Sequence, residues 1–356
     1  MFNDYLDKVF LMVLSTLLFS AIIMPFTSVI AHHIGAIDIP KDSRRVHNKP
    51  MPKLGGLGIF ASFLFGYMLF GIQSIQMNSI LIASFIIIIY GIFDDIKTLS
   101  SRYELLGQFL ATLVITIYGN ILINDITIFG LTINFGILAY PITIFFLLGC
   151  TNAIRLIDGI DGLSSGISSI FFLTIGIIAF FQGKVDTLEI TMAFIMLGSC
   201  FGFLIHNFPP AKLFVGEAGS AFMGFIIGVV SILGYKGTLL TSLVVPITIL
   251  AIPILDTLFA IIRRKLRGKP IFEADKDHLH HQFLKMNFSQ RTTVLIIYSV
   301  DFLFSLVSIL YAIKDQKLAI GLYIFLLLLV FWFVLHTSIV SERLKDKVEK
   351  IEHKKK

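Results

Sequence analysis

Long apolar runs that carry almost no charge constrain this chain more than any other feature. Hydrophobic residues make up 56% of the sequence and charged residues only 15%, whereas soluble domains have roughly 25% charged residues. A helix needs about 20 consecutive apolar residues to cross the hydrocarbon core of a bilayer, and its backbone groups must hydrogen-bond within the segment. The sequence therefore predicts an all-α, polytopic integral membrane protein and excludes an ordinary soluble domain.

Eleven such runs predict about eleven transmembrane helices, which form one domain over residues 1–340 before a charged tail at 341–356. The first run is too long for the apolar core of a signal peptide, so we expect it to remain as a helix. The two cysteines, Cys150 and Cys200, fall in or beside these runs, and we expect them to be buried and unpaired. The expected spans are 9–30, 54–72, 79–93, 104–118, 136–150, 163–181, 187–206, 218–235, 239–262, 293–313 and 318–338.

The distribution of basic residues predicts the orientation. If the spans alternate, 24 of the 29 Lys and Arg residues fall on one side, and the positive-inside rule makes that side cytoplasmic. The N-terminus is then outside and the C-terminus inside. The net charge of +6 is thus a topology signal, and it gives no support to nucleic-acid binding. The cytoplasmic segments are the loops 31–53, 94–103, 151–162, 207–217 and 263–292, with the tail.

Carboxylates gather in these loops, although at the ends of membrane helices they are costly unless solvated, paired or bound to a metal. Asp94 and Asp95 are adjacent, and Asp158 and Asp161 are three residues apart, so a helical turn would place the second pair on one side. The neighbouring glycines at 159 and 162 leave room for a bulky ligand. The structural alternatives are a plain helix end and a Gly/Asp turn.

Two further loops carry candidate ligands. Glu217 begins a span, where the helix dipole favours a carboxylate, but it is also the hard oxygen ligand that Mg²⁺ prefers. The cluster His278, His280 and His281 suggests zinc, yet no cysteine accompanies it and its Lys and Asp neighbours favour a phosphate-bearing ligand. In the first loop, the Pro-x-Pro-Lys-x-Gly-Gly turn at 50–56 offers backbone N–H groups to a phosphate.

Taken in order, these loops resemble the polyprenyl-phosphate N-acetylhexosamine-1-phosphate transferases. The WecA- and TagO-like branch is closer than MraY, the peptidoglycan member. The resemblance extends over nearly the whole chain, from Asp38 to His281. It rests on five pieces: Asp38-x-Pro with 50–56, Asp94-Asp95, 152–163, 207–220 and His278-x-His280-His281.

The resemblance implies a reaction. A polyprenyl phosphate attacks the β-phosphorus of a UDP-N-acetylhexosamine, with UDP-N-acetylglucosamine as the expected donor, and UMP leaves. The lipid-linked product begins an envelope polysaccharide such as teichoic acid or the polysaccharide of lipopolysaccharide. Mg²⁺, or Mn²⁺ in its place, is the implied cofactor. The implied partners are the two substrates and the bilayer, with a homodimer left open.

The resemblance also implies roles for single residues. Glu217 and Asp95 hold the metal, and Asp94 occupies the position proposed for a base. The catalytic set comprises Asp94, Asp95, Asp158, Asp161, His280 and His281. The substrate-binding set comprises Lys49, Lys53, Asn152, Arg155, Asn207, Phe214, Arg263, Arg264 and His278.

Two positions depart from the family pattern, with Arg155 where Asn is usual and Glu217 where Asp is usual. Arg155 is expected either to bind the diphosphate or to pair with Asp158. An inactive scaffold of the same fold is therefore one alternative, and a polytopic transporter or flippase of an anionic lipid is another. A transporter should place ionisable groups near the midplane, as only Asp256 and Asp301 do here.

Overall fold

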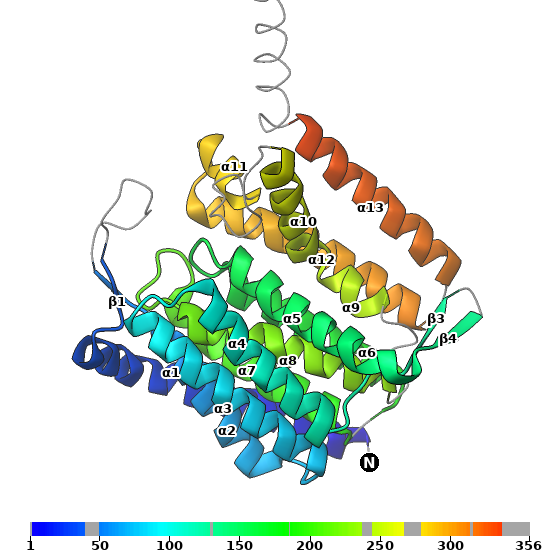
Figure 1. The fold of residues 1–356 in the computed structure, drawn as a ribbon, viewed down its shortest axis with the longest axis horizontal. Helices are drawn as coiled ribbons and strands as arrows, with labels where there is room; N and C mark the ends of the chain where they lie inside the picture. The colour runs from blue at the N-terminus through cyan, green and yellow to red at the C-terminus, as the bar shows by residue number, and fades with distance from the viewer. Residues whose placement is uncertain are drawn as a thin grey trace, which may run out of the picture.

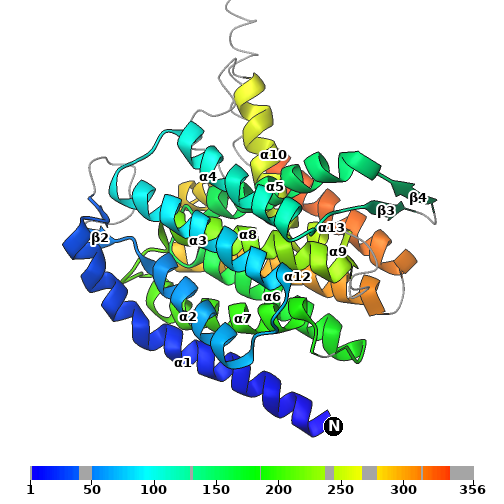
Figure 2. The same cartoon turned by 60° about the horizontal axis from the view of Figure 1, so that its bottom comes forward.

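The computed structural model describes residues 2–39, 50–128, 131–184, 186–236, 244–266, 279–313 and 316–336. These residues form one bundle of helices with two short antiparallel hairpins (Figures 1 and 2). The helices are α1 (Phe2–Ile34), α2 (Gly55–Phe70), α3 (Ile75–Ile96), α4 (Ser101–Leu113), α5 (Ala139–Ile157), α6 (Leu163–Phe181), α7 (Leu188–Asn207), α8 (Gly216–Lys236), α9 (Val244–Ile249), α10 (Ala251–Leu266), α11 (Leu279–Lys285), α12 (Gln290–Ile313) and α13 (Gln316–His336). The strands are β1 (Ile37–Asp38), β2 (Met51–Pro52), β3 (Asp125–Ile128) and β4 (Leu131–Asn134).

In the part of the chain that the structure describes, each expected span overlaps a helix or two consecutive helices. Within the described residues, eight helices have the length and composition to cross a membrane, and α2 is a shorter apolar helix. The prediction of a polytopic helical membrane protein is therefore confirmed. The count of eleven spans and their orientation stay predictions.

Several boundaries differ from those expected. The third span starts earlier, because the Ser74 hydroxyl accepts the N–H of Met77 and so begins α3. The ninth is divided at Leu250 into α9 and α10, since Pro253 has no N–H to continue the helical hydrogen bonding. The two hairpins also correct the all-α expectation: β1 pairs with β2, and β3 pairs with β4.

Helix α8 lies at the centre of the bundle and packs against α2, α3, α5, α6 and α7. In the most apolar 18-residue stretch of α8, 89% of the residues are buried, whereas only 11% are buried in the corresponding stretch of the peripheral α13. Helices in lipid associate through close packing of small residues. A methyl group on Gly56 of α2 would lie 2.2 Å from the backbone nitrogen of Gly219 in α8, so the two backbones touch there.

The two hairpins mark opposite ends of the bundle. Figure 1 shows β3 and β4 at the end that also holds the N-terminus, while β1 lies at the other end. At the N-terminal end, Lys8 of α1 pairs with Asp186, which lies between α6 and α7. The connections that carry the candidate residues all return to the end with β1 and β2, and the site is assembled there.

The contact between α2 and α8 predicts the effect of Gly56→Ala. The added methyl group meets backbone rather than a movable side chain, and such overpacking costs about 1–3 kcal/mol. We expect a melting temperature several degrees below wild type for the detergent-purified protein. Gly149→Ala in α5 is the matched control, because a methyl group there meets nothing within 4 Å. Equal melting temperatures for the two variants would contradict the close approach.

Candidate active site

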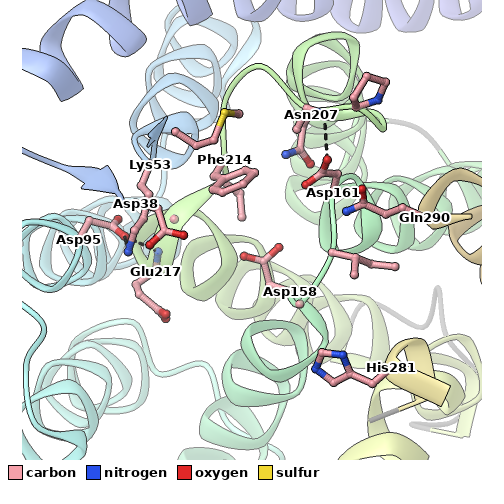
Figure 3. Close-up of a pocket in the computed structure, with 17 residues that line it drawn as sticks. Asp38, Lys53, Asp95, Asp158, Asp161, Asn207, Phe214, Glu217, His281 and Gln290 are labelled. Carbon is pink, nitrogen blue, oxygen red and sulfur yellow. Dashed lines mark hydrogen bonds and ion pairs between the residues drawn. The ribbon is translucent and has the colours of Figure 1, made fainter. Parts of the chain in front are cut away.

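A cavity of about 470 Å³ opens at the end of the bundle that carries β1 and β2. Figure 3 shows Lys53, Asp95 and Glu217 on one side and Asp161, Asn207 and Gln290 on the other, with Asp158 between them. Segments distant in sequence thus meet at one cavity. Its polar and aromatic lining residues are Asp38, Lys53, Asp95, Asp158, Asp161, Asn207, Phe214, Glu217, His281 and Gln290.

Asp95, at the end of α3, fixes the start of α8. Its Oδ1 accepts the backbone N–H of Glu217 at 2.9 Å, and its Oδ2 accepts that of Ala218 at 3.3 Å. A carboxylate is favoured there by the free N–H groups and the dipole of α8. The ammonium of Lys53 lies 3.9 Å from Asp95 Oδ1. Asp95 therefore caps α8, a function that the sequence analysis had considered for Glu217.

Backbone hydrogen bonds join the turn at 50–56 to the segment before α8. Phe214 donates its N–H to the carbonyl of Pro52, while Gly55 and Gly56 donate to the carbonyls of Phe214 and Val215. The N–H groups of the two glycines are therefore occupied, and the expectation that they meet a phosphate is wrong. Their effect is to hold Phe214 at the cavity wall.

Asp158 and Asp161 both line the cavity, but not for the expected reason. Helix α5 ends at Ile157 and α6 begins at Leu163, so the two acids lie on a turn and not on a helical face. Asp161 Oδ2 accepts the N–H of Ala211 at 2.9 Å. The Ser164 hydroxyl donates to Asp158 Oδ1 at 2.7 Å.

The Asp158 carboxyl has a strongly shifted pKa. Burial raises the pKa to about 7, the hydrogen bond from Ser164 opposes the rise, and the negative charges of Glu217 and Asp161 add to it. Lys53 acts in the opposite direction. Asp158 thus changes charge near neutrality, whereas an ordinary aspartate is already ionised there.

Asn207 ties two site loops together. Its Oδ1 accepts the N–H of Gly162 at 2.9 Å and the hydroxyl of Ser165 at 3.2 Å. Its amide nitrogen donates to the carbonyl of Leu213 at 2.9 Å. The side chain is almost fully buried, so its local effect is to hold the turn with Asp158 and Asp161 against the segment with Phe214.

Behind Glu217 lies a second, charged cluster. Two nitrogens of the Arg155 guanidinium contact Glu217 Oε2, Nη2 at 2.6 Å and Nε at 3.0 Å, and Nη2 also donates to Glu104 Oε2 at 2.9 Å. Asp94 Oδ2 lies 3.8 Å from Nη2. Arg155 thus pairs with Glu217 and Glu104 and not with Asp158, while its expected contact with a diphosphate stays a prediction.

This arrangement separates two candidates from the main cavity. Asp94 lines a small neighbouring cavity together with Glu104, Gln108 and Arg155, and its Oδ1 accepts the N–H of Leu99. Asn152 exchanges hydrogen bonds with Gln108. Glu104 and Gln108 were missed in the sequence analysis because they lie inside a predicted span, although a charged residue at a helix start was a usable signal.

The histidine segment reaches the site through α11. His281 lines the cavity, and His280 is buried beside it, with the ring centroids 4.3 Å apart. Asp256 of α10 accepts the N–H of Leu279 at 2.8 Å and so holds the start of α11. A methyl group on Gly159 would lie 2.2 Å from His280 Nε2. His280 therefore fills the space on that side of Gly159, while Gly159 itself lines the cavity, and the approach of a ligand to its backbone stays a prediction.

Other predicted residues lie away from the cavity or cannot be placed. Arg264 is buried in α10 and is not among the residues that line the cavity. Lys49, His278 and the tail after His336 lie outside the described residues, as does the side chain of Arg263.

The charge of the cavity indicates what it can hold. Among its described lining residues are five carboxylates and one lysine, so a phosphate-bearing ligand is repelled unless a cation enters with it. Oxygen ligands of this kind suit Mg²⁺, which binds through one or two carboxylates plus water and substrate phosphates. Within the described part of the chain, no three His, Cys, Asp or Glu side chains form a metal site by themselves. A metal that is shared with substrate phosphates does not require such a group.

Fold and site together define a polytopic membrane protein with an acidic polar cavity at one end, suited to a cation and a phosphate-bearing ligand. The model of glycosyl transferase family 4 matches residues 77–235. A probable undecaprenyl-phosphate N-acetylglucosaminyl 1-phosphate transferase of Bacillus subtilis is 39% identical over 97% of this chain and 96% of its own length.

More distant relatives have names that describe the same kind of transferase. A decaprenyl-phosphate N-acetylglucosaminephosphotransferase of Mycobacterium tuberculosis is 29% identical over 76% of this chain and 74% of its own. An undecaprenyl-phosphate alpha-N-acetylglucosaminyl 1-phosphate transferase of Escherichia coli K12 is 27% identical over 80% of this chain and 78% of its own. The chain belongs to this family of polyprenyl-phosphate N-acetylglucosaminyl 1-phosphate transferases.

The three hydrogen bonds of Asn207 predict that Asn207→Ala loosens the site. Each buried backbone group that loses its partner costs about 1–3 kcal/mol. We expect faster hydrogen–deuterium exchange in the segments 158–163 and 211–215, together with a lower melting temperature. Asn134→Ala, at an exposed residue of β4, is the control. Unchanged exchange in both segments would show that Asn207 does not hold them.

Proposed function

We propose that the protein transfers N-acetylglucosamine 1-phosphate from UDP-N-acetylglucosamine to undecaprenyl phosphate or a similar polyprenyl phosphate, releasing UMP. The observation that carries the proposal is the acidic cavity, in which Asp95, Asp158, Asp161 and Glu217 converge in a chain of this family. The product initiates a cell-envelope polysaccharide.

The cavity offers distinct surfaces to the two parts of a UDP-sugar. Phe214 presents an aromatic ring to the cavity (Figure 3), as a pyrimidine base requires for stacking. Lys53 and His281 lie at the wall and can donate hydrogen bonds to phosphate oxygens. We assign the nucleotide to the side with Phe214 and Asp161, and the diphosphate to the region between Asp158 and Glu217.

The cofactor of this proposal is Mg²⁺, with Mn²⁺ able to replace it. Asp95 and Glu217 are its proposed protein ligands, and both contribute to the cavity wall. When bound, the ion would neutralise the diphosphate and stabilise the leaving UMP. Asp95 also caps α8, so its main contribution is to fix the position of Glu217.

The polyprenyl phosphate supplies the nucleophile. One of its oxygens bonds to the β-phosphorus of the UDP-sugar while the bond from that phosphorus to the UMP oxygen breaks. A phosphate monoester has its second pKa near about 6 and is largely dianionic at neutral pH, so the oxygen needs no base. This suits the position of Asp94 beside Arg155 and outside the residues that line the main cavity.

We also propose the membrane arrangement. The bundle end with the cavity is proposed to face the cytoplasm, because the loops that the sequence assigns to that side carry 24 of the 29 basic residues of the chain. Eleven spans place the N-terminus outside and the C-terminus inside, in the cytoplasmic membrane. The UDP-sugar then reaches the cavity from the cytosol, and the lipid phosphate reaches it from the inner leaflet.

The test is UMP release by detergent-purified protein supplied with undecaprenyl phosphate, UDP-N-acetylglucosamine and Mg²⁺. Release should require both the lipid and the metal. Glu217→Gln and Asp158→Asn should lower kcat/KM by at least about 100-fold, as expected when a group that stabilises transferring charge is removed. The control is Asp125→Asn on β3, at the opposite end of the bundle. No release from any of several UDP-N-acetylhexosamines would instead indicate a transporter or an inactive scaffold.

The raised pKa of Asp158 gives a pH-dependence. If the ionised carboxylate is required, activity falls as the pH drops through about 7. Ser164→Ala removes the hydrogen bond that lowers this pKa, so the fall should begin at higher pH. The rate of UMP release measured against pH reports the shift. Ser168→Ala is the control, because its hydroxyl donates to the carbonyl of Ser164 and not to Asp158. A shift to lower pH in Ser164→Ala would contradict this assignment.

A further inference from the structure

Glu217 belongs to two environments at once. It lines the large cavity with Asp95 and Asp158, and it also lines a small cavity of about 20 Å³ with Glu104 and Arg155. The main cavity is open to a ligand, while the small one has room for little more than a single water molecule. The charges of the small cavity therefore act on any ligand of Glu217.

Three carboxylates converge on one cation in the small cluster. Arg155 Nη2 lies 2.6 Å from Glu217, 2.9 Å from Glu104 and 3.8 Å from Asp94, counted to the nearest carboxylate oxygen. The side chains of Arg155, Asp94 and Glu104 are 13%, 5% and 22% exposed, and that of Glu217, which also faces the main cavity, is 43% exposed. Poorly solvated charges interact strongly, and the three acids would repel one another without a cation among them.

The contact with Glu217 is directional. Both nitrogens of Arg155 that reach it contact the same oxygen, Oε2. The planar guanidinium holds that oxygen in a fixed position. The other oxygen, Oε1, is then the one that can face a ligand of the main cavity.

We propose that Arg155 is a positioning residue that acts as a built-in cation. It holds Glu217 by Oε2, presents Oε1 to the metal and lowers the affinity of the cavity for divalent cations. Arg155 thus offsets one of the three negative charges of the small cluster, whether or not a metal ion is bound. The inference rests on the proposed function only in taking Glu217 as a metal ligand.

The positive charge of Arg155 should weaken the binding of a cation to Glu217. A positive charge that shares a carboxylate with a metal ion competes with that ion. Like charges a few ångströms apart repel each other, and poor solvation strengthens the repulsion. Removal of Arg155 should therefore tighten cation binding, although it also loosens Glu217. A residue with a merely structural role would lower stability and leave cation affinity unchanged or weakened.

The experiment is Mn²⁺ binding to the full-length protein in detergent, without substrates, followed by electron paramagnetic resonance. Arg155→Ala should lower the Kd for Mn²⁺ at least about tenfold. Arg155→Lys keeps the charge but loses the two-nitrogen contact, so its Kd should stay within about threefold of wild type. Arg102→Ala removes an exposed positive charge from the same end of α4 and should leave the Kd unchanged.

A second variant keeps the test decisive if Arg155→Ala does not fold. Glu104→Gln removes one carboxylate that balances Arg155, so the arginine should act more strongly on Glu217 and weaken Mn²⁺ binding. An unchanged or lower Kd in Glu104→Gln would overturn the proposal, as would an unchanged or higher Kd in Arg155→Ala.

UMP release measured on the same samples separates this inference from the proposed function. If the Kd values shift as expected but the wild-type protein releases no UMP, the role of Arg155 stands and the proposed reaction fails. If UMP is released and the Kd values do not shift, the reaction stands and the role of Arg155 is wrong.

Discussion

Asp95 accepts the first backbone N–H groups of α8, and the geometry of the site depends on this contact between two helices. The same helix start is held from a second direction by the hydrogen bonds between Gly55, Gly56 and the segment before α8. Gly216 has φ +74°, and a methyl group there would lie 2.2 Å from the carbonyl oxygen of Lys53. The chain can turn into α8 at this point because position 216 is glycine. Glu217 follows directly, so its place is set by backbone contacts.

The second constraint is the excess of negative charge. The main cavity collects carboxylates from several connections and has Lys53 among its lining residues, while the three carboxylates of the small cluster behind it share Arg155. Such an arrangement is unfavourable for stability alone, because desolvated like charges repel. It suits a site whose missing positive charge arrives with the substrate. The two residues that were expected to depart from the family pattern, Arg155 and Glu217, contact each other directly through Glu217 Oε2.

Sequence reasoning recovered the loops of the site more reliably than the local geometry within them. Asp158 and Asp161 were expected on a helical face and lie on a turn, yet both reach the cavity because Asn207 and Ala211 hold that turn. The turn at 50–56 was expected to offer backbone N–H groups to a phosphate, but the chain itself uses those of Gly55 and Gly56. Glu104 was overlooked because it begins a predicted span, and its partner, Arg155, is 51 residues away in the sequence. Hydrogen-bond partners between distant segments have no local signal.

The sequence by itself determined that the chain is a polytopic helical membrane protein. Apolar segments are unfavourable in water, and in lipid their backbone groups must hydrogen-bond within the segment, so the composition of each segment decides both where it lies and that it is helical. It also determined the chemistry of the site, since the acids, the lysine and the histidines were identifiable by type and order. Only the tertiary structure decided which oxygens and N–H groups are already paired. It placed Asp94 with Arg155 and Asp95 with α8, two neighbours in sequence with different partners. Adjacent residues on a helix point in different directions, so the packing of α3 between α4 and α8 separates their functions.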